Sequence, residues 1–185
     1  RSSAASDVYK RQTKGSLFVA VRGTAVDGHA YMDSAIEKGA VAIVCEEAPS
    51  YLEGRCSFIV VKDSAEALGL LVSRWYGDPS GKLVLVGVTG TNGKTTIATL
   101  LYEMFRKMGH KVGLLSTVCN YIDGEAVPTD HTTPDPLTLH SLMARMAEAG
   151  CEYFCIDAGW YADGDWWDAV GDWRESKKRF PNGVR

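Results

Sequence analysis

Residues 83–96 read LVLVGVTGTNGKTT and hold, in order, an apolar run, a glycine-rich turn and the start of a helix. The apolar run 83–88 predicts a short strand buried on both faces of a sheet. After Lys94, apolar residues recur at helical spacing until Gly109, which predicts an amphipathic helix closed by a glycine. A strand, a tight turn and a helix form the repeating unit of a parallel α/β sheet.

The same alternation extends in both directions from this stretch. Further strands are predicted at 17–21, 41–45, 58–61, 112–115 and 153–156. Further helices are predicted at 29–38, after the capping sequence at 63–66, and after Asp135-Pro136. Asp123-Gly124 lies between two short apolar pairs and predicts a small hairpin. Strand and helix alternate along most of the chain, which favours parallel sheets with right-handed crossovers.

Composition excludes several classes of protein. The chain has 185 residues, of which 45% are hydrophobic and 23% charged, with a net charge of −3. This balance offers no basic surface for duplex nucleic acid or for an anionic membrane, so neither is expected as a partner. No apolar run approaches the roughly 20 residues needed to cross a bilayer. Five cysteines without Cys-x-x-Cys spacing favour reduced, partly buried thiols of a cytoplasmic protein over a metal site. Nothing in the sequence indicates an oligomeric state.

The glycine-rich turn has the residue types that bind phosphate. Gly90 and Gly93 allow backbone N–H groups to converge on an anion, and the following helix N-terminus adds partial positive charge. Lys94 supplies a cation for the β and γ phosphates, and the Thr95 hydroxyl suits Mg²⁺. The alternative is a glycine-rich turn that binds nothing. The predicted nucleotide-binding residues are Gly90, Thr91, Asn92, Gly93, Lys94, Thr95 and Thr96.

These patterns predict an α/β fold: a small amino-terminal α/β domain followed by an incomplete doubly wound parallel-sheet P-loop domain. Four of the five tryptophans lie in the last 26 residues, where the alternation stops. The expected divisions are a disordered or foreign leader at 1–12, a first domain at 13–77, a linker at 78–81, a second domain at 82–157 and a Trp-rich tail at 158–185.

Val88 occupies the position of the first glycine in the general phosphate-loop pattern, and the resulting T-G-T-N-G-K-T-T resembles the loop of the Mur ligases. The segments 17–23, 27–29 and 35–40 are similar to the amino-terminal nucleotide-sugar domain of the MurE-type ligases, and 131–134 to their substrate loop. The resemblance covers about residues 13–153.

The resemblance implies a cytoplasmic, ATP-dependent amide-bond ligase of peptidoglycan synthesis that uses ATP and Mg²⁺. Such an enzyme adds a diamino acid, diaminopimelate or lysine, to UDP-N-acetylmuramoyl-L-alanyl-D-glutamate. ATP phosphorylates an unreactive carboxylate, and the acyl phosphate is attacked by the incoming amine. Lys94 is the residue implied to act on the transferring phosphoryl group.

The resemblance also assigns substrate and metal residues. It implies uridine contacts from Thr24, Ala25 and Val26, and muramoyl-dipeptide contacts from Thr132 and Thr133. Thr117 matches a residue near the phosphates, and Asp157 lies where the family has a Glu that serves Mg²⁺. The alternatives are a plain β–α loop, an ordinary capped turn and a structural strand-end threonine. The predicted metal residues are Thr95, Thr117 and Asp157.

The end of the chain has a different resemblance. Residues 154–161, 171–173 and 179–183 look like a segment of the retaining α-galactosidases with a TIM-barrel catalytic domain. This favours a chimeric chain in which a truncated ligase precedes a piece of glycosidase, and we expect such a chain to be catalytically inactive. Two other functions remain open: a P-loop binding module or kinase-like transferase unrelated to cell walls, and a carbohydrate enzyme defined by the tail. Binding of a UDP-muramoyl ligand at 13–77 would favour the ligase, and galactoside binding at Trp160 and Trp173 the carbohydrate enzyme.

Overall fold

A computed structural model describes residues 14–22, 26–128, 134–157 and 174–181. It divides the chain into two compact units, Arg1–Leu68 and Gly69–Arg185, which are described separately. The division lies inside helix α3 (Ser64–Trp75), whereas the sequence places a linker at 78–81. Those linker residues belong to the second unit, where Pro79 and Ser80 are buried in the 3-10 helix η3 (Pro79–Lys82).

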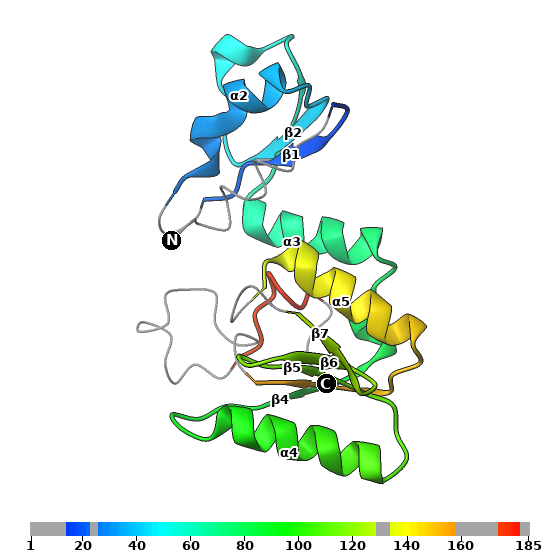
Figure 1. Cartoon of the computed structure of the whole chain (residues 1–185). Coiled ribbons are helices and arrows are strands. Elements are labelled where there is room, and N and C mark those ends of the chain that lie inside the picture. Colours follow the sequence, from blue (N-terminus) through cyan, green and yellow to red (C-terminus); the bar gives the residue numbers. More distant parts are fainter. Residues whose placement is uncertain (1–13, 23–25, 129–133, 158–173, 182–185) are drawn as a thin grey trace. The chain divides into compact units, whose positions relative to one another are not determined.

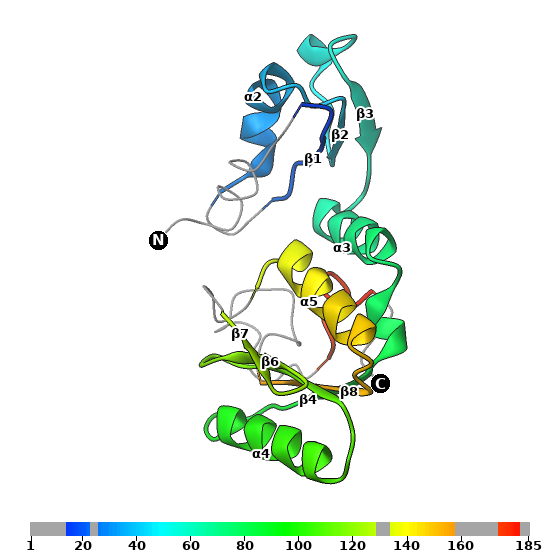
Figure 2. The ribbon, with the colours of Figure 1, turned by 45° about the vertical axis from the view of Figure 1, so that its right-hand side comes forward.

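The first unit has a parallel three-stranded sheet in the order β1-β2-β3 (Figures 1 and 2). Its elements are β1 (Leu17–Val19), η1 (Gly28–Tyr31), α2 (Met32–Glu37), β2 (Ala42–Cys45), η2 (Ser50–Leu52), β3 (Ser57–Val60) and the start of α3. The helix predicted at 29–38 begins instead as the 3-10 turn η1, and the Asp27 side chain caps this turn by accepting a hydrogen bond from the N–H of His29. The core of this unit consists of Phe18, Ala20, Met32, Ala35, Ala40, Ile43, Cys45 and Leu52.

The second unit has a five-stranded sheet in the order β4-β8-β5-β6-β7. Its strands are β4 (Val84–Gly87), β5 (Val112–Leu115), β6 (Asn120–Ile122), β7 (Glu125–Val127) and β8 (Tyr153–Ile156). β4, β8 and β5 are parallel, and the hairpin β6–β7 is antiparallel. Asp123 and Gly124 both have positive φ, which matches the tight two-residue turn that the sequence predicts.

Helices α4 (Lys94–Lys107) and α5 (Pro136–Glu148) cover opposite faces of this sheet (Figures 1 and 2). Each has its own apolar core: Tyr102, Leu114 and Cys155 belong to the core under α4, and Met143 and Phe154 to the core under α5. Strand β8 lies between β4 and β5 although it follows both in sequence. Helices on both faces of a parallel sheet confirm the predicted doubly wound α/β class.

Residues 174–181 are the described part of the predicted tail at 158–185. Phe180 is 1% exposed and belongs to the apolar core under α5. Nε2 of His140, on α5, lies 3.2 Å from the carbonyl oxygen of Arg179. A Cβ added to Gly69 would lie 2.1 Å from the carbonyl oxygen of Lys178. The described tail residues therefore pack as part of the second unit.

None of the helices in the described part of the chain combines the length and the apolar composition needed to span a bilayer.

Candidate nucleotide site

The candidate site lies where three neighbouring parallel strands end. β4 leads into the loop 88–93, Asp157 follows β8, and Thr117 lies two residues after β5. The last residues of these strands are in register, since Ile156 pairs with both Gly87 and Leu115. Ligands of open α/β sheets bind at this carboxyl edge, where the strand order changes direction. The topology thus brings together residues that lie far apart in the sequence.

The glycines of the loop are required by its backbone. Gly90 has a φ of +142° and Gly93, the residue at the N-cap of α4, a φ of +77°. No side-chain hydrogen bond caps this end of the helix, and the first N–H groups of a helix have no acceptor within the helix itself. A helix N-terminus with unpaired donors and partial positive charge is suited to an anion.

Lys94 lies over the loop. Its ammonium group donates to the carbonyl oxygen of Gly90 at 2.8 Å and lies 3.5 Å from that of Thr91. These contacts place a positive charge on the loop, next to the N-terminus of α4. Lys94 and the loop are therefore adjacent, and the role of Lys94 in binding phosphate stays a prediction.

Asp157 is 1% exposed, and its carboxylate meets two threonine hydroxyls. Thr95 donates to Oδ2 at 2.5 Å, and the hydroxyl and backbone N–H of Thr117 both lie 3.5 Å from the same oxygen. The two hydroxyl oxygens are 3.4 Å apart. The predicted metal residues Thr95, Thr117 and Asp157 are therefore adjacent in space.

The other oxygen of Asp157, Oδ1, is buried and has no hydrogen-bond partner among the described residues. A buried carboxylate oxygen without a partner is costly unless a cation or a donor satisfies it. Carboxylate and hydroxyl oxygens are the ligand types that Mg²⁺ prefers. The donor set therefore fits Mg²⁺.

The sequence did not single out two residues next to this site, Ser116 and Asn120. Both are buried, and they make the hydrogen bonds of the turn that carries Thr117. A serine and an asparagine bracketing a short strand connection are a signal for such a turn.

The substrate residues implied by the resemblance are mostly outside the described part of the chain. Thr24, Ala25, Thr132 and Thr133 are not described. Val26 is described and half-buried, next to a network of charged side chains in the first unit.

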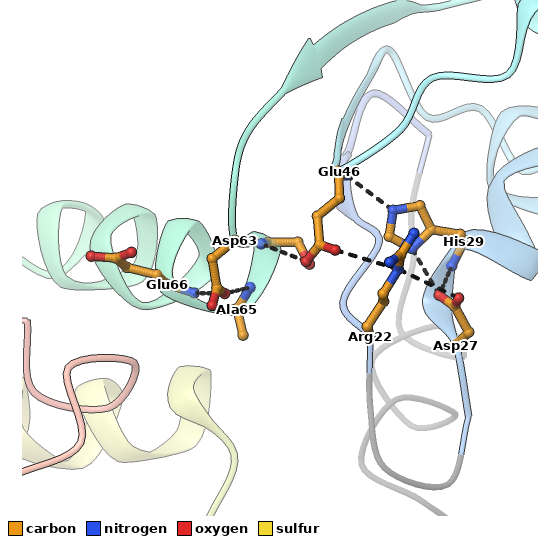
Figure 3. Close-up of polar contacts among 8 residues, drawn as sticks. Arg22, Asp27, His29, Glu46, Asp63, Ala65 and Glu66 are labelled. Atoms are coloured by element: carbon orange, nitrogen blue, oxygen red, sulfur yellow. Dashed lines mark hydrogen bonds and ion pairs between the residues drawn. The ribbon is translucent and has the colours of Figure 1, made fainter. Parts of the chain in front are cut away.

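That network joins Asp27, the end of β2 and the start of α3 (Figure 3). Glu46 accepts hydrogen bonds from the N–H and hydroxyl of Ser64 at 3.1 and 2.8 Å, and its other oxygen pairs with Arg22 at 3.3 Å. Hydrogen bonds from Ser64, above all the one from its backbone N–H, lower the pKa of the Glu46 carboxyl. His29 accepts the N–H of Glu46 through Nε2 and lies 2.7 Å from Asp27 through Nδ1. The network fixes the described residues on both sides of 23–25.

All five cysteines are free thiols, as the sequence predicts. Burial raises the pKa of Cys155 to about 11, and it also raises the pKa of Cys45 and Cys151. These three thiols are therefore protonated and unreactive at neutral pH. In the described ranges, no group of three or more His, Cys, Asp or Glu side chains is arranged to hold a metal ion.

Two family models match the chain. The model of the Mur ligase family catalytic domain matches residues 11–76, and that of the Mur ligase middle domain matches residues 88–170. This chain carries Mur ligase domains. The second match covers the whole candidate site, from the glycine-rich loop to Asp157.

Named relatives agree with the Mur ligase assignment. The chain is 96% identical over 144 residues to a UDP-N-acetylmuramoyl-L-alanyl-D-glutamate–2,6-diaminopimelate ligase of Parabacteroides distasonis, a match that covers 78% of this chain. It is 53% identical over 179 residues to the ligase of the same name from Bacteroides fragilis, and this match covers 96% of the present chain. The two matches span 30% and 36% of those proteins, so the chain has about a third of their length.

Solved structures show the same fold. A structure of a UDP-N-acetylmuramoyl-L-alanyl-D-glutamate–2,6-diaminopimelate ligase matches with a TM-score of 0.66 and 25% identity, over 81% of this chain and 30% of that one. A MurF structure from Acinetobacter baumannii matches with a TM-score of 0.51 at 15% identity, over 83% of this chain and 30% of that one, which supports the fold alone.

The comparisons give no support to a change of family near residue 157. The middle-domain match reaches residue 170, and the Bacteroides fragilis match spans nearly the whole chain. The resemblance of the tail to α-galactosidases rests on its sequence alone, and Trp160 and Trp173 lie outside the described residues.

Proposed function

We propose that the loop 90–96, with Thr117 and Asp157, binds Mg·ATP as the nucleotide site of a peptidoglycan ligase. The observation that carries this proposal is the contact of Thr95 and Thr117 with one oxygen of the buried Asp157, beside a glycine loop at a helix N-terminus. A phosphate loop, two hydroxyls and a carboxylate are the groups that commonly bind ATP and Mg²⁺.

The reaction that we propose for the whole protein is the one named for its relatives. The ligase would join 2,6-diaminopimelate to UDP-N-acetylmuramoyl-L-alanyl-D-glutamate with ATP as the energy source, in the cytoplasm. The names of the relatives favour diaminopimelate over lysine as the added amino acid. The chain has about a third of their length, and the expectation that these 185 residues alone do not catalyse ligation remains a prediction. Release of ADP that depends on added diaminopimelate would contradict it.

Each residue of the site has a role in this proposal. The N–H groups of the loop and of the first turn of α4 would bind phosphate oxygens, and Lys94 would turn from the carbonyl oxygen of Gly90 to the β and γ phosphates. The substrate carboxylate attacks the γ-phosphorus, which leaves an acyl phosphate and ADP. The diaminopimelate amine then attacks the acyl carbon and releases phosphate. The loop stabilises the charge of the transferring group throughout.

Mg²⁺, when bound, neutralises charge on the phosphate oxygens. Thr95, Thr117 and Asp157 are the residues that would hold it. The Thr95 hydroxyl, which donates to Asp157 here, has lone pairs free to face a cation. Asp157 is one methylene shorter than the glutamate of the family and would reach the ion directly or through a water.

Titration calorimetry with Mg·ATP tests the nucleotide site in the chain as it exists. Lys94→Met removes the cation of the loop, and we expect affinity to fall about 10- to 100-fold, the value of a charged hydrogen bond. Lys107→Met is the matched control, because it removes an exposed lysine at the far end of the same helix. Equal affinity of the native chain and the Lys94 variant would contradict the proposal.

Titration with UDP-N-acetylmuramoyl-L-alanyl-D-glutamate separates the ligase from a generic P-loop module. We expect the chain to bind this compound in the absence of ATP, because the first unit carries the proposed uridine-contacting segment at 24–26. A chain that binds Mg·ATP but not the UDP-muramoyl compound would favour the generic module. Binding of a galactoside instead would favour the carbohydrate enzyme.

A further inference from the structure

The connection between β5 and β6 is a short turn, residues 116–119, whose shape depends on two buried polar residues. Asn120 is 2% exposed, and its side-chain oxygen accepts the N–H of Ser116 at 3.2 Å. Ser116 is 4% exposed, and its hydroxyl donates to the carbonyl oxygen of Cys119 at 2.9 Å. The same hydroxyl oxygen accepts the N–H groups of Val118 and Cys119 at 3.3 and 3.2 Å.

These bonds satisfy backbone groups that the strands leave unpaired. Loop N–H and C=O groups without partners cost free energy when buried, and short polar side chains commonly supply the missing partner in turns. Here the polar side chains face inward, while Thr117 and Val118 are exposed at the outside of the turn. The internal bonds therefore determine where the turn presents Thr117.

In this position Thr117 contacts the other two residues of the proposed metal site. Its hydroxyl lies 3.4 Å from that of Thr95 and 3.5 Å from Asp157, and its backbone N–H also lies 3.5 Å from Asp157. The side-chain hydrogen bonds of Ser116 and Asn120 lie within the turn and do not reach Asp157 or Thr95, so the two residues act on the site through the turn. A displacement of the turn by 1 Å would be enough to separate Thr117 from the carboxylate.

We propose that Ser116 and Asn120 are positioning residues for the magnesium side of the nucleotide site. They hold the turn 116–119 so that Thr117 shares the proposed Mg²⁺ position with Thr95 and Asp157. This inference rests on the proposed function. On this inference, the turn contributes to the increase in ATP affinity that Mg²⁺ provides. The affinity for ATP without Mg²⁺ comes from Lys94 and the loop.

The test measures the affinity for ATP twice, with Mg²⁺ and with EDTA, by titration calorimetry on the 185-residue chain. The ratio of the two dissociation constants is the magnesium gain. In Ser116→Ala and in Asn120→Ala we expect this gain to fall about 3- to 10-fold, the effect of about one hydrogen bond, with the affinity in EDTA unchanged. Ser116→Thr keeps the hydroxyl and is expected to retain the gain.

Ser73→Ala is the matched control. Ser73 is 1% exposed, and its hydroxyl donates to Asp78 at 3.0 Å, so the variant loses a comparable buried hydrogen bond away from the site. We expect its magnesium gain to equal that of the native chain. Thermal unfolding followed by circular dichroism identifies any variant that does not fold, and the Ser116 and Asn120 variants each test the inference independently.

The possible results separate the two proposals. A native chain that does not bind ATP overturns the proposed function, and the inference with it. A native chain that binds ATP with a magnesium gain, in which both alanine variants keep that gain, overturns the inference alone. A loss of the gain in Ser73→Ala as large as in Ser116→Ala would also overturn it, because the effect would then follow from lost stability.

Discussion

The hydroxyl of Thr95 donates to Asp157 across 2.5 Å, although the two residues are 62 positions apart. Thr95 lies in the first turn of α4, and Asp157 follows the strand that pairs with β4. The contact is a product of strand order, because β8 inserts beside the strand that leads into the glycine loop. The carboxylate thereby meets the hydroxyls of both Thr95 and Thr117.

Asp157→Asn should separate stability from magnesium binding. The carboxylate is buried and its described partners all meet Oδ2, so asparagine keeps an oxygen acceptor for the Thr95 hydroxyl and replaces a carboxylate whose Oδ1 has no partner among the described residues. We expect the free energy of unfolding to stay within about 1 kcal/mol of the native value or to rise. We expect the gain in ATP affinity from Mg²⁺ to fall about tenfold or more.

Urea denaturation and calorimetry measure these two quantities. Asp123→Asn is the matched control, because Asp123 lies in the β6–β7 turn at a positive φ that asparagine also tolerates. A variant at position 157 that keeps the full magnesium gain would remove Asp157 from the site.

Gly93→Ala should strain the loop without filling any space. A Cβ on Gly93 would meet nothing within 4 Å, but the residue has a φ of +77°. The left-handed conformation costs a non-glycine residue about 1–2 kcal/mol, so we expect a loss of stability of that size and weaker Mg·ATP binding. Gly81→Ala is the control, since Gly81 also has open space around it and lacks a positive φ. Equal stability of the two variants in urea would contradict the prediction.

Phe180→Ala should destabilise the second unit. The ring is 1% exposed in the core under α5, and truncation of a buried phenylalanine costs about 3–5 kcal/mol. Trp75→Ala removes a larger ring that is 83% exposed, and it should cost less than about 0.5 kcal/mol. Urea denaturation of both variants measures the difference. A Phe180 variant as stable as the Trp75 variant would show that residues 174–181 are not part of this core in solution.

His140 should make the second unit less stable in mild acid. It is fully buried on α5, burial lowers its pKa below the ordinary value of 6.5, and its Nδ1 has no partner among the described residues. As the pH falls below about 6.5, the unfolded chain binds a proton that the native ring does not, so the free energy of unfolding decreases until the native pKa is reached. His140→Gln does not titrate and should lose this part of the slope.

Urea midpoints of the native chain and of His140→Gln between pH 8 and pH 5 measure this prediction. The other titrating groups are shared by the two proteins, so the difference between their slopes isolates His140. Parallel slopes over the whole range would contradict the prediction.

Much of the fold follows from local patterns. The apolar run 83–88, the loop and the helix from Lys94 were predicted together, and the structure has β4 and α4 there. The hairpin at Asp123-Gly124 and the helix that starts after Asp135 were also predicted, and both are confirmed by positive φ values in the turn and by the Asp135 cap. These features depend on a few neighbouring residues, which a sequence displays directly.

Other features depend on partners that are distant in sequence. The break at 77–81 looks like a linker, yet Asp78 accepts from Ser73 and Arg74, and Pro79 is buried. Phe180 has no periodic pattern around it, and only the core under α5 explains its burial. The hydrogen bonds of Ser116 and Asn120 could not be predicted as features of the site, because only the position of β8 brings Asp157 next to the turn that they form.

The strand order has a consequence for biosynthesis. β8 is the middle member of the three parallel strands, but the ribosome makes it after both of its neighbours. While the chain emerges, β4 and β5 lack the strand that joins them, and their apolar edges stay open until residues 153–156 are released. The same insertion delivers Asp157, so closing the nascent sheet and bringing the carboxylate to Thr95 and Thr117 are a single event.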